Sequence, residues 1–358
     1  MRIGNISDTT SDSDVLIAGA GLAGRLCAWR YARAGRRVRL FDAARRDDTR
    51  SASAVAAAML SPLAELAVAD AQVHALAQQA MALWPDWLLA LQADSGRPVY
   101  FRRAGTLVLA HAADGGSLDH FERVLRHKLA PAEQHAIHVL DAAGIAEHEP
   151  ALEGRFARGL LLAGEGQIAN DELLVALARA LDRFRVHWHE DEPVEQLRAD
   201  GLRTAQGEFR APLVIDARGL GARTDWPGLR GVRGEILSVE CAGIALQRPV
   251  RLMHPRYQLY VAPRPKQRFI VGATELESED AGPPSLRSVL ELGSALYSLH
   301  PAFAEARVLR IDAALRPALD DHRPQLRRHA GIWQLNGLYR HGYLCAPALV
   351  DQLLQETT

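Results

Sequence analysis

The chain has 358 residues, of which 48% are hydrophobic and 24% are charged. This composition is typical of a folded globular protein of about two domains and excludes disordered, collagen-like and disulfide-scaffold proteins. Lysine plus arginine (42) balances aspartate plus glutamate (43), for a net charge of -1, so a nucleic acid is not an expected partner.

Cysteine spacing and hydropathy indicate the compartment. Cys27, Cys241 and Cys345 lie far apart in the sequence, which argues against a disulfide framework or a zinc site and favours a reducing compartment. The polar segment 1–13 lacks the basic and apolar regions of a signal peptide and is predicted to be a flexible arm. No apolar stretch of about 18 residues is free of charges, so we expect no membrane span and a cytoplasmic protein.

The first unit predicted along the chain is a β-α-β unit. The apolar run from Val15 to Ala18 predicts a buried parallel strand. A helix is predicted from about Leu22 to Ala34, ended by Gly35, and a second strand from Val38 to Phe41. A unit of this length is typical of the start of a nucleotide-binding sheet.

The remaining chain predicts a long helical stretch and then a strand-rich middle. Residues 45–61 are expected to form a loop, and residues 63–93 a helical stretch with a break near Pro85. Further strands are predicted at 99–103, 106–110, 159–163, 185–189, 193–197, 213–216, 234–239, 258–262, 269–272, 308–313 and 331–334. Further helices are predicted at 118–129, 170–182, 286–299 and 347–354. This order suggests a nucleotide domain interrupted by a second, antiparallel domain.

A glycine motif directly follows the first strand. Gly19, Gly21 and Gly24 have the G-x-G-x-x-G spacing, and Asp42 stands 18 residues after the third glycine. In this motif the glycines allow a tight turn, close approach of a pyrophosphate and helix packing, while the acid accepts hydrogen bonds from a ribose. The helix N-terminus offers free N–H groups to the phosphates. The motif leaves NAD and FAD open and disfavours NADP.

Six later segments resemble one flavoprotein family and follow its order. Ser51–Glu65 is similar to the family segment A-S-x-A-A-G-M-L-x-P-x-x-E, and 166–170 is similar to G-Q-V-D-P. The other four segments are 260–264 (Y-x-x-P-R), 272–275 (G-A-T), 315–317 (G-L-R-P) and 337–348 (G-H-x-R-N-G-x-x-x-A-P-A). Through these residues the chain resembles the glycine oxidases of the D-amino-acid oxidase (DAO) family of FAD enzymes.

The resemblance implies a mixed α/β fold. A Rossmann-type, glutathione-reductase-like FAD-binding domain would be formed by 14–95, 151–228 and 317–358. An inserted antiparallel-sheet substrate domain would be formed by 96–150 and 229–316. FAD would be bound non-covalently, because no cysteine lies between Arg316 and Arg340, where some relatives attach their flavin.

The resemblance also implies the site residues. Arg316, Arg340 and Tyr260 would bind a substrate carboxylate through two guanidinium groups and a hydroxyl, and Gln258 and Glu275 would line the same pocket. The expected FAD residues are Gly19, Gly21, Leu22, Ala23, Gly24, Asp42, Ala43, Ser51, Ser53, Ala57, Ala58, Met59, Val194, Gly219, Arg316, Gly337, Tyr339, Arg340, His341, Gly342 and Tyr343. No metal site is expected, because the histidines of the strand at 185–189 lack a third ligand.

Several of these positions depart from the family pattern. Glu275 stands where glycine oxidase has an apolar methionine, Gln258 where it has histidine, and Ala58 where it has a glycine next to the flavin. Leu338 and His341 change the C-terminal signature. A carboxylate at Glu275 suits a polar or cationic substrate group better than a methyl group, so glycine itself is left open as the substrate.

The resemblance implies an FAD-dependent oxidoreductase that oxidises the CH–NH bond of an amine or amino acid, in the class of glycine, sarcosine or D-amino acids. Hydride transfer to flavin N5 would give an imine, which water hydrolyses. Oxygen or a quinone would accept the electrons, and a homo-oligomer stays open. The alternatives are a flavoprotein acting on an aminomethyl-modified tRNA base, or a flavin-binding subunit or pseudoenzyme that needs a partner. An NAD dehydrogenase is less favoured, because the later segments match flavoproteins.

Overall fold

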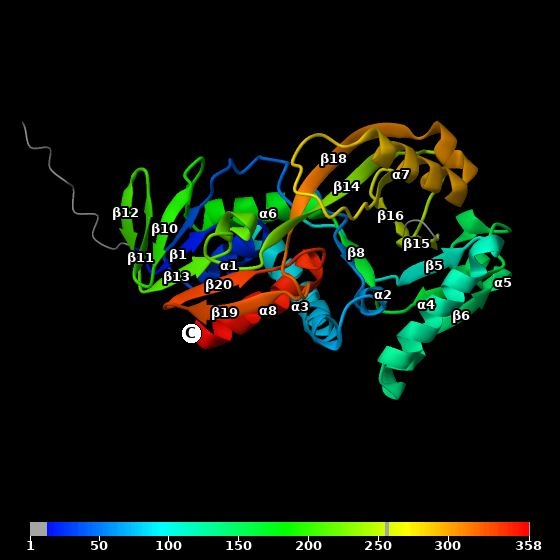
Figure 1. Cartoon of the computed structure of the whole chain (residues 1–358), viewed down its shortest axis with the longest axis horizontal. Helices are drawn as coiled ribbons and strands as arrows, with labels where there is room; N and C mark the ends of the chain where they lie inside the picture. Colours follow the sequence, from blue (N-terminus) through cyan, green and yellow to red (C-terminus); the bar gives the residue numbers. More distant parts are fainter. Residues whose placement is uncertain (1–12, 255–257, 358) are drawn as a thin grey trace, which may run out of the picture.

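The structure is a computed structural model that describes residues 13–254 and 258–357. Two large β-sheets organise it and follow one another along the long axis of the molecule (Figure 1). The arm predicted at 1–13 lies outside the described residues except for Ser13, whose hydroxyl accepts a hydrogen bond from Arg39 Nε at 3.0 Å. No helix within the described ranges is long and apolar enough to cross a membrane.

The first large sheet has six strands and contains the predicted β-α-β unit. All its neighbouring strands are parallel except the pair at the β19 edge. In sheet order the strands are β19 (Gln325–His329), β20 (Ile332–Asn336), β13 (Leu213–Asp216), β1 (Val15–Ala18), β2 (Val38–Phe41) and β9 (His187–His189).

Alternate residues of β1 face two different layers, as the pleat of a strand requires. Val15 and Ile17 belong to the main core, which also contains Trp29 and Trp84. That core joins the sheet to the helices α1 (Leu22–Arg33), α3 (Ala71–Ser95), α6 (Asn170–Arg183) and α8 (Gly342–Thr357). Leu16 packs instead against a small antiparallel sheet of β10 (Val194–Arg198), β11 (Gly201–Thr204) and β12 (Gly207–Arg210). The result is a three-layer unit.

The second large sheet has eight strands and is antiparallel apart from one parallel pair, β5 with β15. In sheet order its strands are β18 (Arg307–Ala318), β14 (Arg230–Glu240), β17 (Arg268–Gly272), β16 (Gln258–Arg264), β15 (Val250–Met253), β5 (Thr106–Ala110), β7 (Arg158–Leu162) and β6 (Ile137–Asp141). The helices associated with it are α4 (Gly115–Lys128), α5 (Ala142–His148) and α7 (Leu286–Leu299).

Short elements connect the two units. A third small sheet consists of β3 (Met59–Leu60), β8 (Gly166–Ile168) and β4 (Phe101–Arg102), and α2 (Pro62–Leu66) follows β3. The 3-10 turns are η1 (Ala112–Asp114), η2 (Pro131–Ala136), η3 (Pro150–Leu152), η4 (Gly219–Ala222) and η5 (Pro301–Glu305). β7 lies within the segment assigned above to the FAD domain yet pairs in the eight-stranded sheet, so the exact domain boundaries stay a prediction.

The predicted helix break near Pro85 is wrong. Helix α3 runs without interruption through Pro85, and the helical stretch is broken instead between Leu66 and Ala71. Proline costs a helix interior about 3 kcal/mol, but the neighbouring Trp84 and Trp87 are 1% and 4% exposed in the main core. Burial of two large aromatic side chains offsets that cost.

Other boundaries also moved. Helix α8 begins at Gly342, five residues before the predicted start, and includes Pro347. The strands β3, β6, β8, β11, β12, β15 and β19 and the helix α5 were not predicted. The Ala-rich run at 54–58 lies in a loop without helix or strand, as predicted.

Candidate active site

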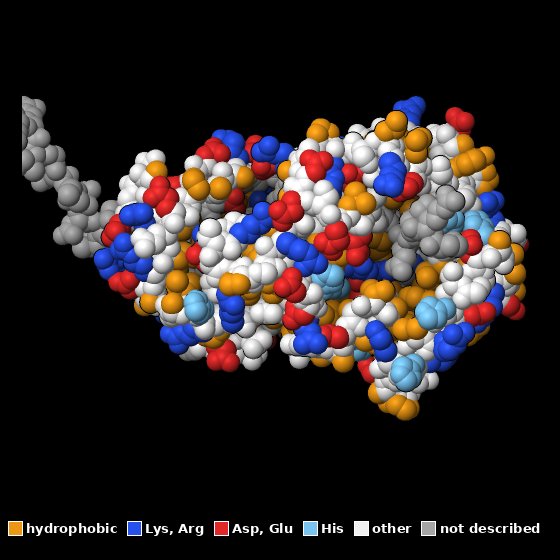
Figure 2. Space-filling model, in the orientation of Figure 1, with side chains coloured by type: hydrophobic (Ala, Val, Ile, Leu, Met, Phe, Trp, Pro, Cys, Tyr) orange, Lys and Arg blue, Asp and Glu red, His pale blue; other side chains and the backbone are white. Residues whose placement is uncertain are grey.

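A cavity of about 690 Å³ lies between the six-stranded sheet and the eight-stranded sheet. Figure 2 shows acidic and basic side chains next to one another over the middle of the molecule, between the two units. The predicted site residues that line the cavity are Leu22, Ala23, Ser53, Ala57, Ala58, Met59, Gly219, Tyr260, Glu275, Arg316, Tyr339, Arg340, Gly342 and Tyr343.

The other predicted residues lie outside the cavity lining. They are Gly19, Gly21, Gly24, Asp42, Ala43, Ser51, Val194, Gly337 and His341. Ala43 and Ser51 are exposed, and Val194 is the first residue of β10. Gln258 is the first residue of β16, and its side chain lies outside the described part of the structure.

The glycine turn between β1 and α1 is closely packed on its protein side. Gly19 has φ +98°, and a Cβ at Gly24 would lie 1.8 Å from the Gly19 carbonyl oxygen. A Cβ at Gly21 would meet only Ser53 Oγ, at 3.9 Å, and no side chain caps the N-terminus of α1. The turn therefore leaves open space at Gly21 beside unoccupied N–H groups, which fits the pyrophosphate of FAD.

Asp42 holds this turn together. Its two carboxylate oxygens accept hydrogen bonds from the backbone N–H groups of Ala20 and Ala44. Each oxygen keeps further acceptor capacity, so the side chain fits the predicted contact to a ribose.

The loop that precedes β3 passes along the cavity with small side chains and is anchored from behind. Its backbone carbonyls accept hydrogen bonds from Asn170 Nδ2 at 2.8 Å, from the Tyr343 hydroxyl at 2.7 Å and from the Arg264 guanidinium. Ala58 has φ +48°, a left-handed conformation that favours glycine, the residue of the family pattern given above at this position. The rigid, narrow loop leaves room for a flat ring.

A buried carboxylate organises the charged end of the cavity. Glu65, on α2, accepts hydrogen bonds from Arg340 Nε at 2.7 Å, from Arg340 Nη2 at 3.2 Å and from Arg251 Nη2 at 2.7 Å. The two guanidinium groups hold the pKa of the Glu65 carboxyl well below its usual range despite its burial. Arg340 Nη1 donates to Glu275 at 2.7 Å, so all three terminal nitrogens of Arg340 are engaged.

His341 lies next to this cluster as a neutral ring. Its Nδ1 is 3.6 Å from Glu65 Oε2 and makes no hydrogen bond among the described residues. Burial lowers the pKa of His341 to about 4, against the attraction of Glu65. His341 therefore adds no positive charge at neutral pH.

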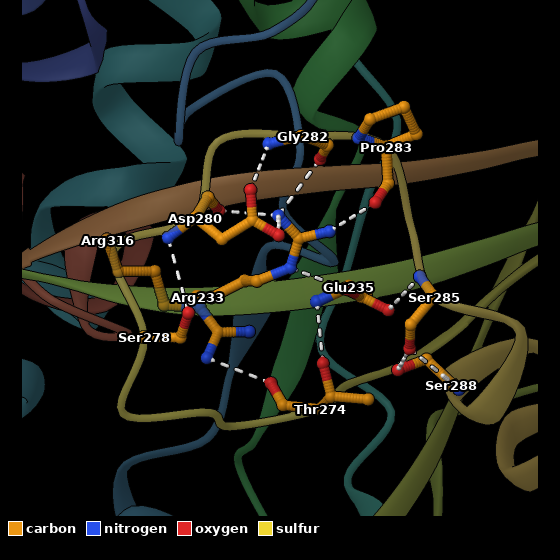
Figure 3. Close-up of polar contacts among 10 residues, drawn as sticks. All are labelled: Arg233, Glu235, Thr274, Ser278, Asp280, Gly282, Pro283, Ser285, Ser288 and Arg316. Atoms are coloured by element: carbon orange, nitrogen blue, oxygen red, sulfur yellow. Dashed lines mark hydrogen bonds and ion pairs between the residues drawn. The ribbon is translucent and has the colours of Figure 1, made fainter.

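Arg316 differs from the other arginines of the cavity. Every carboxylate that lines the cavity pairs with an arginine: Glu65 and Glu275 as above, and Glu291 with Arg287 at 3.5 Å. Arg316, within the described structure, donates only to the carbonyl oxygen of Thr274, at 3.2 Å (Figure 3). Arg316 is thus a cation with donors to spare at the cavity wall.

Tyr260 lies at the same end of the cavity, on β16. Burial raises the pKa of its hydroxyl, so the hydroxyl stays protonated and able to donate near neutral pH. The sequence analysis did not identify Glu65 and Arg251 as site residues. Glu65 was quoted as the last residue of a family segment, and an acid within the apolar run Pro62–Leu66 was the available signal.

No group of three or more histidine, cysteine, aspartate or glutamate side chains in the described ranges could hold a metal ion. The glycine turn, the narrow loop and the cavity described above, by contrast, contain many of the expected FAD residues, and their shape and chemistry fit that cofactor.

Comparison with known proteins agrees with this geometry. The chain is 38% identical over 339 residues to the Rhizobium etli protein named as the thiamine biosynthesis oxidoreductase ThiO, covering 95% of this chain and 94% of that one. It is 27% identical to glycine oxidase of Geobacillus kaustophilus, covering 93% and 90% of the two chains. The crystal structure of glycine oxidase from that organism has a TM-score of 0.83, at 26% identity, over 97% of this chain and 94% of that one.

The iminodiacetate oxidase of Chelativorans sp. BNC1 shares the fold, with a TM-score of 0.80 at 22% identity over 95% and 94% of the two chains. A family model described as DAO, FAD dependent oxidoreductase, matches residues 14–353. The predicted resemblance, fold class and cofactor are confirmed, and the chain belongs to the DAO family of FAD-dependent oxidoreductases.

Proposed function

We propose that the chain oxidises the CH–NH bond of an α-amino carboxylate, in the class of glycine, sarcosine and D-amino acids, to an imine that water hydrolyses. The proposal rests on one observation: Arg316 is a cation without a carboxylate partner among the described residues, on the wall of the cavity that the FAD loop also lines. The activities named for the relatives, glycine oxidase and a thiamine biosynthesis oxidoreductase, support the same class of reaction.

Arg316 and Tyr260 are assigned to the substrate carboxylate. The planar guanidinium of Arg316 has donors left after its bond to Thr274, and these match the two oxygens of a carboxylate. Bound FAD supplies the acceptor for the hydride. The residues of this chain anchor the substrate, orient its C–H bond and exclude water. A substrate amine that binds in its neutral form needs no protein base.

Arg340 and Glu275 are assigned to the rest of the substrate. Because Glu65 and Glu275 already engage the nitrogens of Arg340, Arg340 would reach a carboxylate only by releasing Glu275. The Glu275 side chain is 46% exposed and lines the cavity. It supports a substrate with a polar or cationic group over one with a bare methyl group at this position.

An anaerobic titration of the holoenzyme with glycine, sarcosine and D-alanine tests the proposed reaction. At least one of them should bleach the oxidised flavin spectrum, and subsequent addition of oxygen or of a quinone identifies the electron acceptor. A flavin that stays oxidised with all three would overturn the proposed substrate class.

Substitution of the anchor tests the proposed site. Arg316→Ala should cost about 2–5 kcal/mol of transition-state binding, roughly 30-fold or more in kcat/KM. Arg179→Ala, on the exposed face of α6, is the control and should leave kcat/KM unchanged. Equal values of kcat/KM for the two variants would remove Arg316 from the site.

Two further expectations belong to the same proposal. The three cysteines are free and buried, which supports a reducing compartment such as the cytoplasm. Assembly into a homo-oligomer is tested by the mass of the purified holoenzyme in solution.

A further inference from the structure

An ion pair is buried in strand β14, outside the lining of the cavity. Arg233 and Glu235 are 3% and 0% exposed, and Arg233 Nε donates to Glu235 Oε1 at 2.6 Å. They stand two residues apart on a strand, so their side chains point to the same face. Moving two charges out of water is costly. The other hydrogen bonds of Arg233 and Glu235 indicate what the buried pair does.

The pair fastens the segment 273–285, which connects β17 to α7. Arg233 donates to the backbone carbonyls of Asp280, Gly282 and Pro283, the last two at 2.9 and 2.6 Å (Figure 3). Glu235 Oε2 accepts from the N–H of Ser285 at 3.3 Å. The segment has only one β-bridge of its own, Arg233 with Leu276, so these side chains supply partners that regular structure would otherwise provide.

The segment 273–285 also contacts the part of the cavity that contains Arg316 and Arg340. Glu235 N–H donates to Thr274 Oγ1 at 2.9 Å, and Thr274 N–H donates to the Glu235 carbonyl at 3.2 Å. The Thr274 carbonyl is the acceptor for Arg316, and the next residue, Glu275, is the partner of Arg340. The position of Thr274 therefore affects where the Arg316 guanidinium lies.

The residue between the two charges leaves space for Arg316. Gly234 pairs with Ala314 across the β14–β18 ladder, two residues from Arg316. A Cβ at Gly234 would lie 2.1 Å from Arg316 Nη2 and 2.2 Å from its Cζ, so the guanidinium lies directly against the glycine backbone. The tripeptide 233–235 thus fastens the segment with one face and receives the Arg316 guanidinium on the other.

We propose that Arg233 and Glu235 are positioning residues, which act through Thr274 to place the Arg316 guanidinium for the substrate carboxylate. Gly234, which has no side chain, leaves the space that the guanidinium occupies. This inference rests on the proposed role of Arg316 and adds three residues that the sequence analysis did not identify. A lysine at position 233 would keep a positive charge opposite Glu235. Only the branched guanidinium of arginine can also donate to three separate carbonyl oxygens.

Binding of acetate to the holoenzyme, followed through the flavin visible spectrum, tests the inference without turnover. Arg233→Lys keeps the charge opposite Glu235 but cannot reproduce the fork, so it should weaken acetate binding about tenfold. In the Arg316→Met background the same substitution should change the acetate Kd less than about twofold, because the group being positioned is gone. Gly234→Ala should likewise weaken acetate binding, because its methyl group displaces the Arg316 guanidinium.

Arg223→Met is the matched control. Arg223 pairs with Glu279 of the same segment at the surface, with the two side chains 40% and 51% exposed, and its loss should leave the acetate Kd unchanged. A merely structural role of Arg233 would lower the unfolding midpoint and weaken acetate equally in both backgrounds, which would overturn the inference. If Arg316→Met alone leaves acetate binding intact, the anchor of the proposed function fails instead.

Discussion

At the scale of single residues, the described charges of the cavity are arranged in pairs that leave Arg316 without a carboxylate partner. Glu65 balances Arg251 and shares Arg340 with Glu275, and the Arg316 guanidinium is left to a neutral carbonyl. An anionic substrate group would find its partner at Arg316, since ion pairing elsewhere requires breaking an existing pair. His341 is close enough to disturb this balance and stays neutral only because it is buried.

The free energy of unfolding should fall in acid partly because of His341. Its pKa is lowered to about 4 from 6.5, so the unfolded chain takes up a proton between these values and the folded chain does not. Stability from this group is present above pH 6.5 and is lost as the pH falls toward 4. The difference is about 3 kcal/mol, and His341→Asn should remove it.

Urea unfolding at pH 7 and pH 4.5 measures this contribution as the difference between the parent protein and His341→Asn. The groups that face His341 include Glu65, Arg340 and His322, and they are the same in both proteins. His138→Asn, at an exposed position of β6, is the control and should lose as much stability on acidification as the parent. A parallel loss in His341→Asn would show that folding does not lower the pKa of the His341 ring.

Motifs made some of the site residues predictable. Arg316, Arg340, Tyr260 and Glu275 stand in sequence segments with a family pattern, and all four line the cavity. Arg233 and Glu235 carry no such signal: two charged residues at alternate positions of a strand usually face solvent. Only the fold places the carbonyl-rich segment at 273–285 against that face, so their burial could not be read from local sequence.

At the scale of elements, two glycines of the turn from β1 to α1 have different roles. Gly24 packs against the protein, whereas Gly21 faces the open space proposed for FAD. Gly24→Ala would place a methyl group 1.8 Å from a backbone oxygen, so it should destabilise the apoprotein and abolish FAD binding. Gly21→Ala meets no protein atom closer than 3.9 Å, so it should leave the apoprotein as stable as the parent. It should weaken FAD binding at least tenfold, because the methyl group would face the phosphates of FAD bound at this turn.

Thermal unfolding of the two apoproteins, together with fluorescence titration of FAD, distinguishes these effects. Equal stability of the Gly24→Ala apoprotein and the parent would show that the turn can shift to accept a side chain. Unchanged FAD affinity of Gly21→Ala would place the pyrophosphate elsewhere.

The local sequence pattern predicted the helices and strands whose hydrophobic periodicity is strong. It was wrong where tertiary packing determines the secondary structure. The β-α-β unit and α7 follow their predicted ranges closely. Strand β19 reads Gln-Leu-Arg-Arg-His and lies at a sheet edge, where the backbone pairing of β20 overrides a polar sequence. Pro85 in α3 shows the same override by aromatic burial.

At the scale of the whole molecule, the cavity is the place where the two large sheets meet. Its lining comes from both ends of the chain and from the middle: Leu22 and Ala23 begin α1, Tyr260 lies on β16, and Tyr343 lies on α8. A cofactor that fills such a cavity contacts both sheets at once. Its binding free energy therefore stabilises their arrangement as well as the site itself.

Removal of FAD should lower the unfolding temperature of the entire chain. At a free FAD concentration 100 times its Kd, the cofactor should add about 2.7 kcal/mol to the free energy of unfolding. Calorimetry of the apoprotein with increasing FAD should show one transition that moves upward with the logarithm of the FAD concentration, and Gly24→Ala should show no such movement. Two transitions, of which FAD moves only the one that belongs to the six-stranded unit, would contradict this expectation. That outcome would mean that the substrate end of the cavity is held by contacts such as Arg233 with Glu235 alone, and that the cofactor stabilises only the sheet that follows the glycine turn.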